Sequence, residues 1–493
     1  MDKSNITPVV PRTTVRYREE ALNLLFILFA LGLRLFALPN IPGVLGDEGW
    51  SYVQIQSYLQ GLPYTFSVPS GRMLHPLYIL VALITRASDP FWMRFPSFLI
   101  GAGTLVLCFY LVRNLYGSRA AFLTTLLAAT FPPHLHYSRL AWDCSFIPLF
   151  SLLLTYFMLQ KRWPLFVITL IGGFSVHPSL GLLALPGLLI FLAERRVSKK
   201  LLLTGLVATF LASASYVVLK DIPLLIPTPG SFLRFLYGVL DFAAGTIVSQ
   251  DPLDNKQSYF VAGFAILILG IFILSYRSLI PSVRRLLLGS LLSLVALYLL
   301  RGAWSVLPGH ERSILYLGFP LVLSLALSIE GQKASRALEI LSSGFYLAVT
   351  LLFYFAPAIS SGGHGLQTRS GPEEPKYAAA EWIVSQHQQG KLDIVAEDWG
   401  IYWNVFNYAL GHFTGPVELK RVTDQPGFSP ESKIADVTEF RSLMDLGAFA
   451  VGFRGGHIAK FIQEETLQGQ RYSRIGFRDY SGEDFIYVWI KER

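Results

Sequence analysis

The chain has 493 residues, of which 52% are hydrophobic and 15% are charged. Soluble proteins carry about 25% charged residues, so this composition argues against a soluble globular enzyme. It also excludes a disordered chain, because disorder combines low hydrophobicity with high charge. We therefore expect a polytopic α-helical membrane protein.

The net charge of +8 is distributed unevenly along the sequence. Residues 1–357 contain 27 Lys and Arg against 15 Asp and Glu, whereas residues 358–493 contain 14 against 18. In the first part the basic residues lie between apolar runs, as they do in membrane-protein loops, and not on a polar, aromatic face of the kind that binds nucleic acid. We predict a transmembrane domain over 1–357, a separate domain over 358–493 and no nucleic-acid partner.

The apolar runs in chain order predict eleven spans. The first run, 21–39, is too long for the hydrophobic region of a signal peptide and predicts a spanning helix. Further spans are expected at 95–112, 119–134, 145–160, 163–177, 179–193, 201–219, 258–275, 286–300, 313–329 and 337–357. The run 75–87 is too short to cross a bilayer and predicts a helix lying at the membrane surface.

Positive charge gives the orientation of these spans. With a cytoplasmic N-terminus, the segments 1–20, 113–119, 161–162, 194–200, 276–285 and 331–336 are cytoplasmic and carry 17 of the 27 basic residues. Because cytoplasmic loops of membrane proteins are rich in Lys and Arg, this distribution favours an N-terminus inside and a C-terminal domain outside. The two large outside loops are then 40–94 and 220–257. We expect a multi-pass protein of the cytoplasmic membrane.

The C-terminal part alternates between helical and strand patterns. Helices are predicted at 376–389, 401–410, 436–446 and 457–468, and strands at 392–397, 417–422, 448–453, 472–478 and 484–490. Alternation of this kind predicts a small α/β domain outside the membrane.

The first candidate for chemistry is Gly46-Asp47-Glu48-Gly49-Trp50, which directly follows the first span. Two adjacent carboxylates at the mouth of a membrane domain suit a polar substrate, and one of them could act as general base on a hydroxyl. The alternative is local, because Asp47 could cap a helix from about 48 to 60 while Glu48 interacts with its dipole.

Two further candidates contain basic residues. Arg72 and His75 lie in the same outside loop as Asp47 and could hold a lipid phosphate; the alternative is a snorkelling arginine and a structural histidine. Arg139 and Asp143 are four residues apart at the outside end of a span, where ionisable groups are costly unless they are paired or functional. Their alternative is a mutual ion pair that orders the loop.

Four motifs in order resemble the C-type membrane glycosyltransferases, in the superfamily of protein O-mannosyltransferases and lipid A aminoarabinose transferases. They are Asp47-Glu48 in the first outside loop, His75-Pro76-Leu77 before a short surface helix, Arg94-Phe95-Pro96-Ser97 with Gly101 in the next span, and Ser138-Arg139 followed by Asp143. The resemblance covers roughly residues 20–200. One proline of the His-Pro-Pro form is replaced, and the tryptophan-rich motif of oligosaccharyltransferases is absent from the sequence.

The resemblance implies an enzyme that moves a hexosyl or pentosyl group from a polyprenyl-phosphate donor to a hydroxyl on a protein, lipid or glycan, with inversion at the anomeric carbon. Asp47 would be the general base, and Glu48 would orient Asp47 or bind the acceptor. No nucleotide or metal is required in this branch of the superfamily, and whether a divalent ion binds near Asp47 is left open by the sequence.

The resemblance also implies roles for the basic motifs. His75, together with Arg72, would contact the donor phosphate. Arg139 would stabilise that leaving group or hold the loop, and Asp143 would orient Arg139 or contact the sugar. Two other functions remain open at this point: a transporter or flippase for a lipid-linked sugar, and a non-catalytic membrane scaffold whose C-terminal domain binds a partner.

Overall fold

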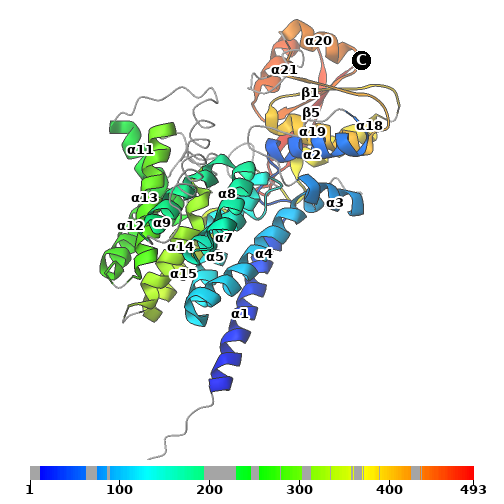
Figure 1. The fold of residues 1–493 in the computed structure, drawn as a ribbon. Helices are drawn as coiled ribbons and strands as arrows, with labels where there is room; N and C mark the ends of the chain where they lie inside the picture. Colours follow the sequence, from blue (N-terminus) through cyan, green and yellow to red (C-terminus); the bar gives the residue numbers. More distant parts are fainter. Residues whose placement is uncertain are drawn as a thin grey trace, which may run out of the picture.

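The computed structural model describes residues 12–62, 75–85, 89–193, 229–245, 255–277, 279–301, 313–332, 335–356, 371–387, 389–422 and 436–492, with the short stretches 359, 369 and 433–434. A helical domain is followed by an α/β domain that lies over one of its ends (Figure 1). The predicted span 201–219 and the predicted domain boundary at 357 lie outside the described residues, as do 220–228 and 246–254 of the second large loop.

Most helices of the first domain fall on the predicted apolar runs, whereas Gly46–Leu59 (α2) and Pro229–Ala244 (α11) lie within the two predicted outside loops 40–94 and 220–257. The helices are α1 (Arg12–Leu35), α2 (Gly46–Leu59), α3 (His75–Thr85), α4 (Pro90–Tyr116), α5 (Ser118–Thr130), α6 (Pro132–Tyr137), α7 (Ile147–Leu159), α8 (Trp163–Val176), α9 (Ala184–Leu192), α11 (Pro229–Ala244), α12 (Asn255–Ser275), α13 (Pro281–Arg301), α14 (Gly318–Glu330) and α15 (Ser335–Val349). Short 3₁₀ turns η1 (Asp143–Phe146), η2 (Pro178–Leu183) and η6 (Leu315–Leu317) precede α7, α9 and α14, and the π-helical turn η7 (Thr350–Phe355) follows α15.

Local sequence explains where these helices begin and end. At α4 the Asp89 carboxylate accepts the N–H groups of Phe91 and Trp92 at 2.9 and 3.2 Å, which caps the helix directly before Pro90. At the other end Gly117 has a φ of 92°, a conformation that glycine adopts without steric cost, and α5 starts at the next residue.

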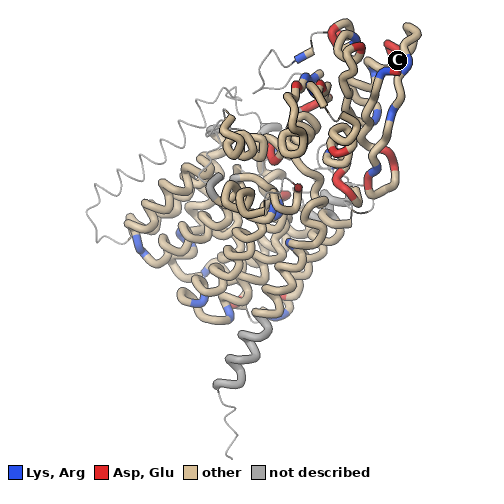
Figure 2. The backbone as a smooth tube through the Cα atoms, turned by 90° about the vertical axis from the view of Figure 1, so that its right-hand side faces the viewer, with Lys and Arg blue, Asp and Glu red and all other residues tan. Residues whose placement is uncertain are grey.

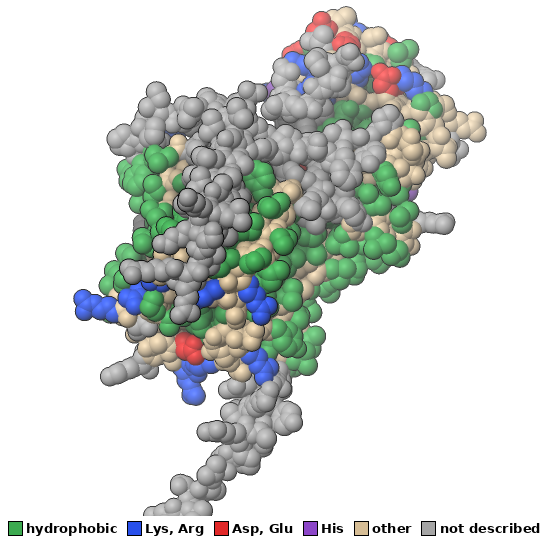
Figure 3. Space-filling model, viewed as in Figure 1, with side chains coloured by type: hydrophobic (Ala, Val, Ile, Leu, Met, Phe, Trp, Pro, Cys, Tyr) green, Lys and Arg blue, Asp and Glu red, His purple; other side chains and the backbone are tan. Residues whose placement is uncertain are grey.

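The outer surface of the helical domain is apolar. Leucines and isoleucines face outward from several helices, with Leu274 76% and Ile340 72% exposed, and Figure 3 shows the resulting broad hydrophobic surface. Among the described residues, Pro90–Tyr116 and Pro281–Leu299 are long and apolar enough to span a bilayer individually, and six other apolar helices are shorter. A polytopic membrane fold accounts for such a surface, whereas the predicted number of eleven spans stays a prediction.

Basic residues gather at the end of the helical domain that lies opposite the C-terminal domain (Figure 2). They come from helix ends and short turns, namely Arg113, Arg119, Lys161, Arg162, Arg277, Arg284, Arg285 and Arg336. One ion pair, between Arg119 and Glu339 at 3.7 Å, joins two of these helix ends. The C-terminal domain instead mixes acidic and basic residues over its surface.

The C-terminal domain is an α/β unit, as predicted. Its five strands β1 (Leu392–Ala396), β2 (Val417–Arg421), β3 (Phe449–Phe453), β4 (Tyr472–Arg478) and β5 (Asp484–Lys491) form one sheet in the order β2-β1-β3-β5-β4. The first three strands are parallel, and β5 runs antiparallel to both β3 and β4. All five residues of β3 are buried, which is typical of a central strand covered on both faces. The helices are α18 (Pro375–Gln386), α19 (Trp399–His412), α20 (Val437–Asp445) and α21 (His457–Leu467).

A buried carboxylate joins three elements of this domain. Glu397 directly follows β1, and its oxygens accept the N–H groups of Phe453, at the end of β3, and of His457, at the start of α21, at 2.8 and 2.6 Å. Burial raises the pKa of Glu397 to about 7. The folded domain therefore binds a proton at Glu397 more readily than the unfolded chain does.

Candidate active site

Glu48 is the centre of a buried polar cluster at the start of α2. Its side chain is fully buried and forms a two-pronged ion pair with Arg94 of α4, at 2.9 Å from Nε and 2.7 Å from Nη2. The same carboxylate accepts the N–H of Leu45 at 2.9 Å and the N–H of Ala141 at 2.6 Å. Glu48 therefore connects the start of α2, the first turns of α4 and the loop after α6. Both of its carboxylate oxygens accept hydrogen bonds from these elements.

Asp47 lies one residue earlier and has a different environment. Neighbouring helix residues point about 100° apart, so Asp47 does not share the buried face of Glu48. Its side chain is partly exposed, and its carbonyl oxygen accepts the Ser51 hydroxyl at 2.8 Å. Of the two predicted catalytic carboxylates, Asp47 is thus the more exposed one.

Arg139 is fully buried and faces the end of α1. Its five N–H groups donate to the carbonyl oxygens of Leu33, Arg34, Phe36 and, twice, Ile41, over 2.6–3.0 Å. These include carbonyls of the last turn of α1, where no intrahelical donor exists and the helix dipole is negative. The guanidinium also lies 5.2 Å from the ring centre of Phe355. Each of its donors is used, so this geometry matches the predicted alternative in which Arg139 holds the loop.

A second buried arginine binds the same stretch of backbone, and a third lies in the last turn of α1. Arg94 donates to the carbonyls of Leu38, Pro39, Pro42 and Gly43 in addition to Glu48. Arg34 donates to Ala30 and Ala129 and lies 3.1 Å from His134 Nδ1. These three guanidiniums and the single carboxylate of Glu48 leave two positive charges uncompensated within the group, directly behind the segment that carries Asp47.

The C-terminal domain holds this segment from the other side. The Glu374 carboxylate accepts the N–H of Val44 at 3.3 Å and pairs with the fully buried Lys376 at 2.5 Å. Asn404 of α19 donates to the Val44 carbonyl at 3.1 Å, and Asn40 donates to the carbonyl of Pro372 at 2.7 Å. The residues leading into α2 are therefore hydrogen-bonded to both domains.

Helix α2 itself packs along α19, and Figure 1 shows the two helices side by side below the sheet. Gly49 permits this approach, because a Cβ at that position would lie 2.6–2.8 Å from atoms of Asn404 and Trp403. The rings of Trp50 and Trp403 meet edge to face with centroids 6.4 Å apart. The acidic pair thus lies at the junction of the two domains.

A second contact between the domains is made by Tyr377. Its hydroxyl lies 2.9 Å from the sulfur of Met93 and accepts a hydrogen bond of 2.8 Å from Asn407. Burial raises the pKa of Tyr377 well above its ordinary value, so the hydroxyl stays protonated at neutral pH.

The structure leaves the other predicted site residues less defined. Arg72 lies outside the described residues, and His75 is the first residue of α3 without a described side chain. Asp143 begins η1, directly after the loop that Glu48 holds through Ala141, and its side chain is likewise not described. The convergence of these residues with Asp47 stays a prediction.

Sequence reasoning did not single out several residues that support the site. Arg94 appeared as part of a motif but without a partner, and Glu374, Lys376 and Asn404 were not identified. An ionisable residue inside a predicted span was the available signal for Arg94, since such a residue requires a partner. The contacts of Glu374 and Asn404 join residues more than 300 positions apart, for which no local pattern exists.

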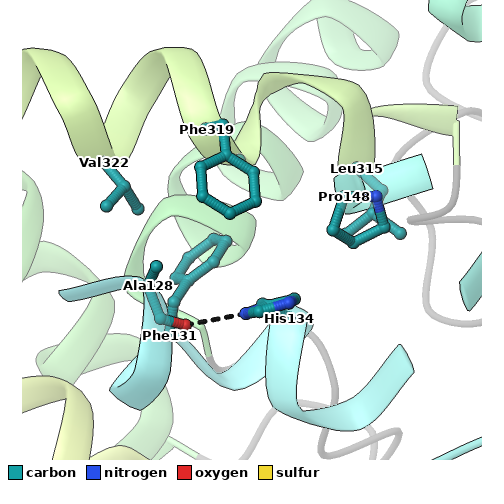
Figure 4. A pocket seen from close by; sticks show the side chains of 8 residues that line it. Ala128, Phe131, His134, Pro148, Leu315, Phe319 and Val322 are labelled. Carbon is teal, nitrogen blue, oxygen red and sulfur yellow. Dashed lines mark hydrogen bonds between the residues drawn. The ribbon is translucent and has the colours of Figure 1, made fainter. Parts of the chain in front are cut away.

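A small apolar pocket of the helical domain lies between α5, α6, α7 and α14, with a cavity volume of about 10 Å³, or room for about one water molecule (Figure 4). Phe131, Pro148, Leu315, Phe319 and Val322 point into it, and His134 lies at its edge with Nδ1 2.9 Å from the Ala128 carbonyl. One ionisable side chain among eight lining residues cannot hold the many polar groups of a sugar phosphate. The polar cluster around Glu48, and not this cavity, is therefore the candidate site.

The chain is similar to known proteins in part of its sequence and in its fold. A family model described as dolichyl-phosphate-mannose-protein mannosyltransferase matches residues 75–219. No curated protein matches the chain. The structure of ArnT from Cupriavidus metallidurans bound to undecaprenyl phosphate is similar with a TM-score of 0.58 and 12% identity, covering 97% of this chain and 98% of that one.

Two other solved structures are also similar. ArnT from Cupriavidus metallidurans in the apo state gives a TM-score of 0.56 at 13% identity, covering 95% of this chain and 98% of ArnT. The oligosaccharyltransferase AglB from Archaeoglobus fulgidus in complex with an inhibitory peptide and a dolichol-phosphate gives 0.46 at 14% identity, covering 89% and 69%. The match to ArnT over nearly the whole chain shows the fold, a helical membrane domain with a C-terminal sheet domain. With the family-model match it confirms the resemblance to C-type membrane glycosyltransferases of the protein O-mannosyltransferase and lipid A aminoarabinose transferase superfamily.

Proposed function

We propose that this chain is an inverting glycosyltransferase that moves a sugar from a polyprenyl-phosphate donor to an acceptor hydroxyl of a protein, lipid or glycan. The observation that carries the proposal is the different environment of the two carboxylates in the acidic pair. Glu48 is buried and bonded to Arg94, Leu45 and Ala141, whereas its neighbour Asp47 is partly exposed at the junction of the two domains. A rigidly supported, accessible carboxylate is what a general base requires.

The proposed transfer is a direct displacement at the anomeric carbon of the donor sugar. Asp47 takes the proton from the acceptor hydroxyl, and the acceptor oxygen forms the new bond to the anomeric carbon. The bond between that carbon and the phosphate oxygen breaks, the configuration inverts, and the polyprenyl phosphate leaves with its electron pair. In this proposal the leaving group requires positive charge and not an acid catalyst, because a phosphate monoester is a weak base.

The buried arginines support the departure of an anion at this position. The group of Arg34, Arg94, Arg139 and Glu48 has an excess of two positive charges, and in a low-dielectric protein interior such charges act over longer distances than in water. We propose that Arg72 and His75 contact the donor phosphate directly, and that Asp143 contacts the sugar or positions the loop. The guanidinium of Arg139 acts from a distance, because its N–H groups already bond backbone carbonyls.

We also propose that the N-terminus is cytoplasmic and the C-terminal domain lies outside, in the cytoplasmic membrane of a bacterium or archaeon. The basic residues at the end of the helical domain opposite the C-terminal domain support this orientation, because Lys and Arg favour the cytoplasmic side. Asp47 is then on the outer side. The similarity to ArnT, whose structure holds undecaprenyl phosphate, supports a donor that stays in the bilayer.

The test is transfer by the purified chain with a panel of polyprenyl-phosphate sugars and acceptors. Asp47→Asn keeps the size of the side chain but removes the base, and we expect it to lower the transfer rate by about 10²–10⁴-fold. Asp445→Asn, at an exposed carboxylate of the C-terminal domain, is the matched control and retains native transfer. Native transfer by Asp47→Asn would exclude the proposed base.

Donor binding is measured separately, by mass spectrometry of polyprenyl-phosphate lipids that copurify with the chain. We expect His75→Ala to reduce the donor species, whereas Asp47→Asn retains them. Movement of a lipid-linked sugar across the bilayer with no transfer to any acceptor would instead favour a flippase. Absence of both donor binding and transfer would favour a scaffold.

A further inference from the structure

Tyr78 directly follows the His75-Pro76-Leu77 motif and lies on the buried face of α3. Its side chain is 4% exposed, and Val81 of the same face is also buried. Leu83 and Ile84, on the other face of this helix, are more than half exposed, as expected for a helix at a membrane surface. Tyr78 therefore lies where α3 packs onto the rest of the helical domain.

The Tyr78 hydroxyl lies among polar groups of two other elements. It is 2.6 Å from Oγ of Ser97, in α4, and 3.3 Å from the carbonyl oxygen of Trp142. The hydroxyl of Ser145, in η1, is 3.5 Å away. Both serines are buried, so these hydrogen bonds form away from bulk water, where the loss of a partner is costly. The Tyr78 hydroxyl thus connects α3 to α4 and to the turn η1.

Ser97 extends this network to the same turn. Its hydroxyl donates to the carbonyl of Leu140 and lies 3.2 Å from the Ser145 hydroxyl. Because the Ser97 proton is directed at that carbonyl, its oxygen can accept the proton of Tyr78. The segment 140–145 is therefore connected to α3 both directly and through Ser97.

These contacts lie on both sides of two proposed site residues. His75 is the first residue of α3, three residues before Tyr78 and so about one turn away. Asp143 begins η1 and lies between Trp142 and Ser145, which both contact this hydroxyl. A single hydroxyl therefore connects the helix that carries His75 to the turn that carries Asp143.

The ring of Tyr78 makes a separate contact with α2, the helix of Asp47. It meets the ring of Tyr52 edge to face, with the two centroids 6.2 Å apart. This aromatic contact does not need the Tyr78 hydroxyl. Removal of the hydroxyl alone should therefore loosen η1 relative to α3 without displacing α2.

We propose that Tyr78 is a positioning residue for the sugar-phosphate group of the donor, because its hydroxyl fixes the start of α3 relative to η1. The inference rests on the proposed function, in which His75 contacts the donor phosphate and Asp143 contacts the sugar or positions the loop. The separation of these two elements decides whether one sugar phosphate can reach both. Loss of the hydroxyl weakens donor binding and leaves the acceptor side, on α2, unchanged.

The test is binding of decaprenyl-phosphate mannose and decaprenyl-phosphate arabinose to the full-length chain in detergent, measured by native mass spectrometry. Tyr78→Phe keeps the ring and its contact with Tyr52 but removes the hydroxyl. We expect it to raise the Kd of the better probe about fivefold to tenfold, the range that one buried hydrogen bond supplies. In the transfer reaction the donor KM should rise by the same factor, whereas the acceptor KM stays native.

Tyr316→Phe is the matched control. Tyr316 is fully buried, and its hydroxyl donates to Ser293 at 3.0 Å, so this second tyrosine–serine pair joins η6 to α13. Both variants lose one buried hydrogen bond and should lower the Tm to a similar extent, but Tyr316→Phe should keep the native Kd and donor KM.

A second variant tests the network through the partner of Tyr78. Ser97→Ala should also raise the Kd, because it removes the hydroxyl that bonds both Tyr78 and the Leu140 carbonyl. The double variant should bind no more weakly than the weaker of the two single variants, since groups of one network are not additive.

The proposal is overturned if Tyr78→Phe binds both probes with the native Kd, if Tyr316→Phe weakens binding equally, or if Tyr78→Phe raises the acceptor KM as much as the donor KM. Absence of transfer by the native chain refutes the proposed function alone, and the Kd values still decide the role of Tyr78. Binding of neither probe to the native chain overturns that role as well.

Discussion

Replacing Gly49 by alanine tests whether the position of Asp47 depends on the C-terminal domain. A Cβ at Gly49 would lie 2.6 Å from Oδ1 of Asn404, 2.8 Å from its backbone nitrogen and 2.8 Å from the carbonyl carbon of Trp403. Two of these three atoms belong to the main chain of α19 and cannot rotate away. To accommodate the methyl group, α2 and α19 must move apart.

The size of the effect follows from two opposing terms. Overpacking costs about 1–3 kcal/mol, and we expect about 3 because the obstacle is backbone. Alanine stabilises a helix interior over glycine by about 1 kcal/mol, which offsets part of this cost. The contact between the domains should therefore weaken by about 2 kcal/mol, or roughly 30-fold in its equilibrium constant.

The assay combines hydrogen exchange with transfer. Amides of residues 44–50 and 400–408 should exchange faster in Gly49→Ala, including the Val44 amide that donates to Glu374, and transfer should fall with it. Gly103→Ala is the control, because a Cβ on this glycine of α4 meets no atom within 4 Å. Native exchange at Val44 together with native transfer in Gly49→Ala would refute the dependence on the C-terminal domain.

Three further predictions follow from the described contacts. Arg139→Lys leaves at most three N–H donors for the carbonyls that now receive five hydrogen bonds. The free energy of unfolding should fall by about 3 kcal/mol, which a lower Tm would show. An unchanged Tm would contradict the role of Arg139 in holding the loop. Because the folded pKa of Glu397, about 7, lies above its ordinary 4.5, its stabilising contribution is complete below pH 4.5 and is lost as the pH rises through 7. This contribution is about 3 kcal/mol at most, and Glu397→Gln should remove it from the pH dependence of unfolding, whereas a native pH dependence in the variant would exclude Glu397. Finally, EDTA should leave transfer unchanged, and a loss that Mg²⁺ or Mn²⁺ restores would show that a metal is required.

Most of the fold was predictable because it follows local rules. Apolar runs predicted α8 and α12 within three residues and α4 and α13 within five, since a bilayer requires long hydrophobic helices. Helix α1 begins nine residues before its predicted run, because its first turns carry charged residues that an apolar run does not include. In the C-terminal domain, the runs 392–397 and 448–453 are short and apolar, and they became β1 and the central strand β3. The strand order, with β4 at the edge and β3 between β1 and β5, could not be predicted in the same way, because it depends on pairings across long stretches of chain.

The acidic pair of the candidate site stood out in the sequence, but the partners of these two carboxylates did not. Asp47 and Glu48 stood out as carboxylates after a span, yet nothing local distinguished the buried one from the accessible one. The deciding contacts are those of Glu48 with Arg94 and with the Ala141 amide, 46 and 93 residues away. Arg139 donates to carbonyls near the end of α1, about 100 residues earlier in the chain, and these contacts have no local pattern in the sequence.

These contacts bear on how the two domains cooperate. A guanidinium bonded to backbone carbonyls fixes the course of the chain, whereas one bonded to a carboxylate mainly fixes a side chain. Arg94 and Arg139 bind carbonyls on both sides of residue 40, and Glu374 and Asn404 bind the next residues from the C-terminal domain. The position of the segment that carries Asp47 therefore depends on contacts with both domains. If the proposed function is correct, we expect the C-terminal domain to form a wall of the active site, and a chain cut after residue 357 to lose transfer in the same assay.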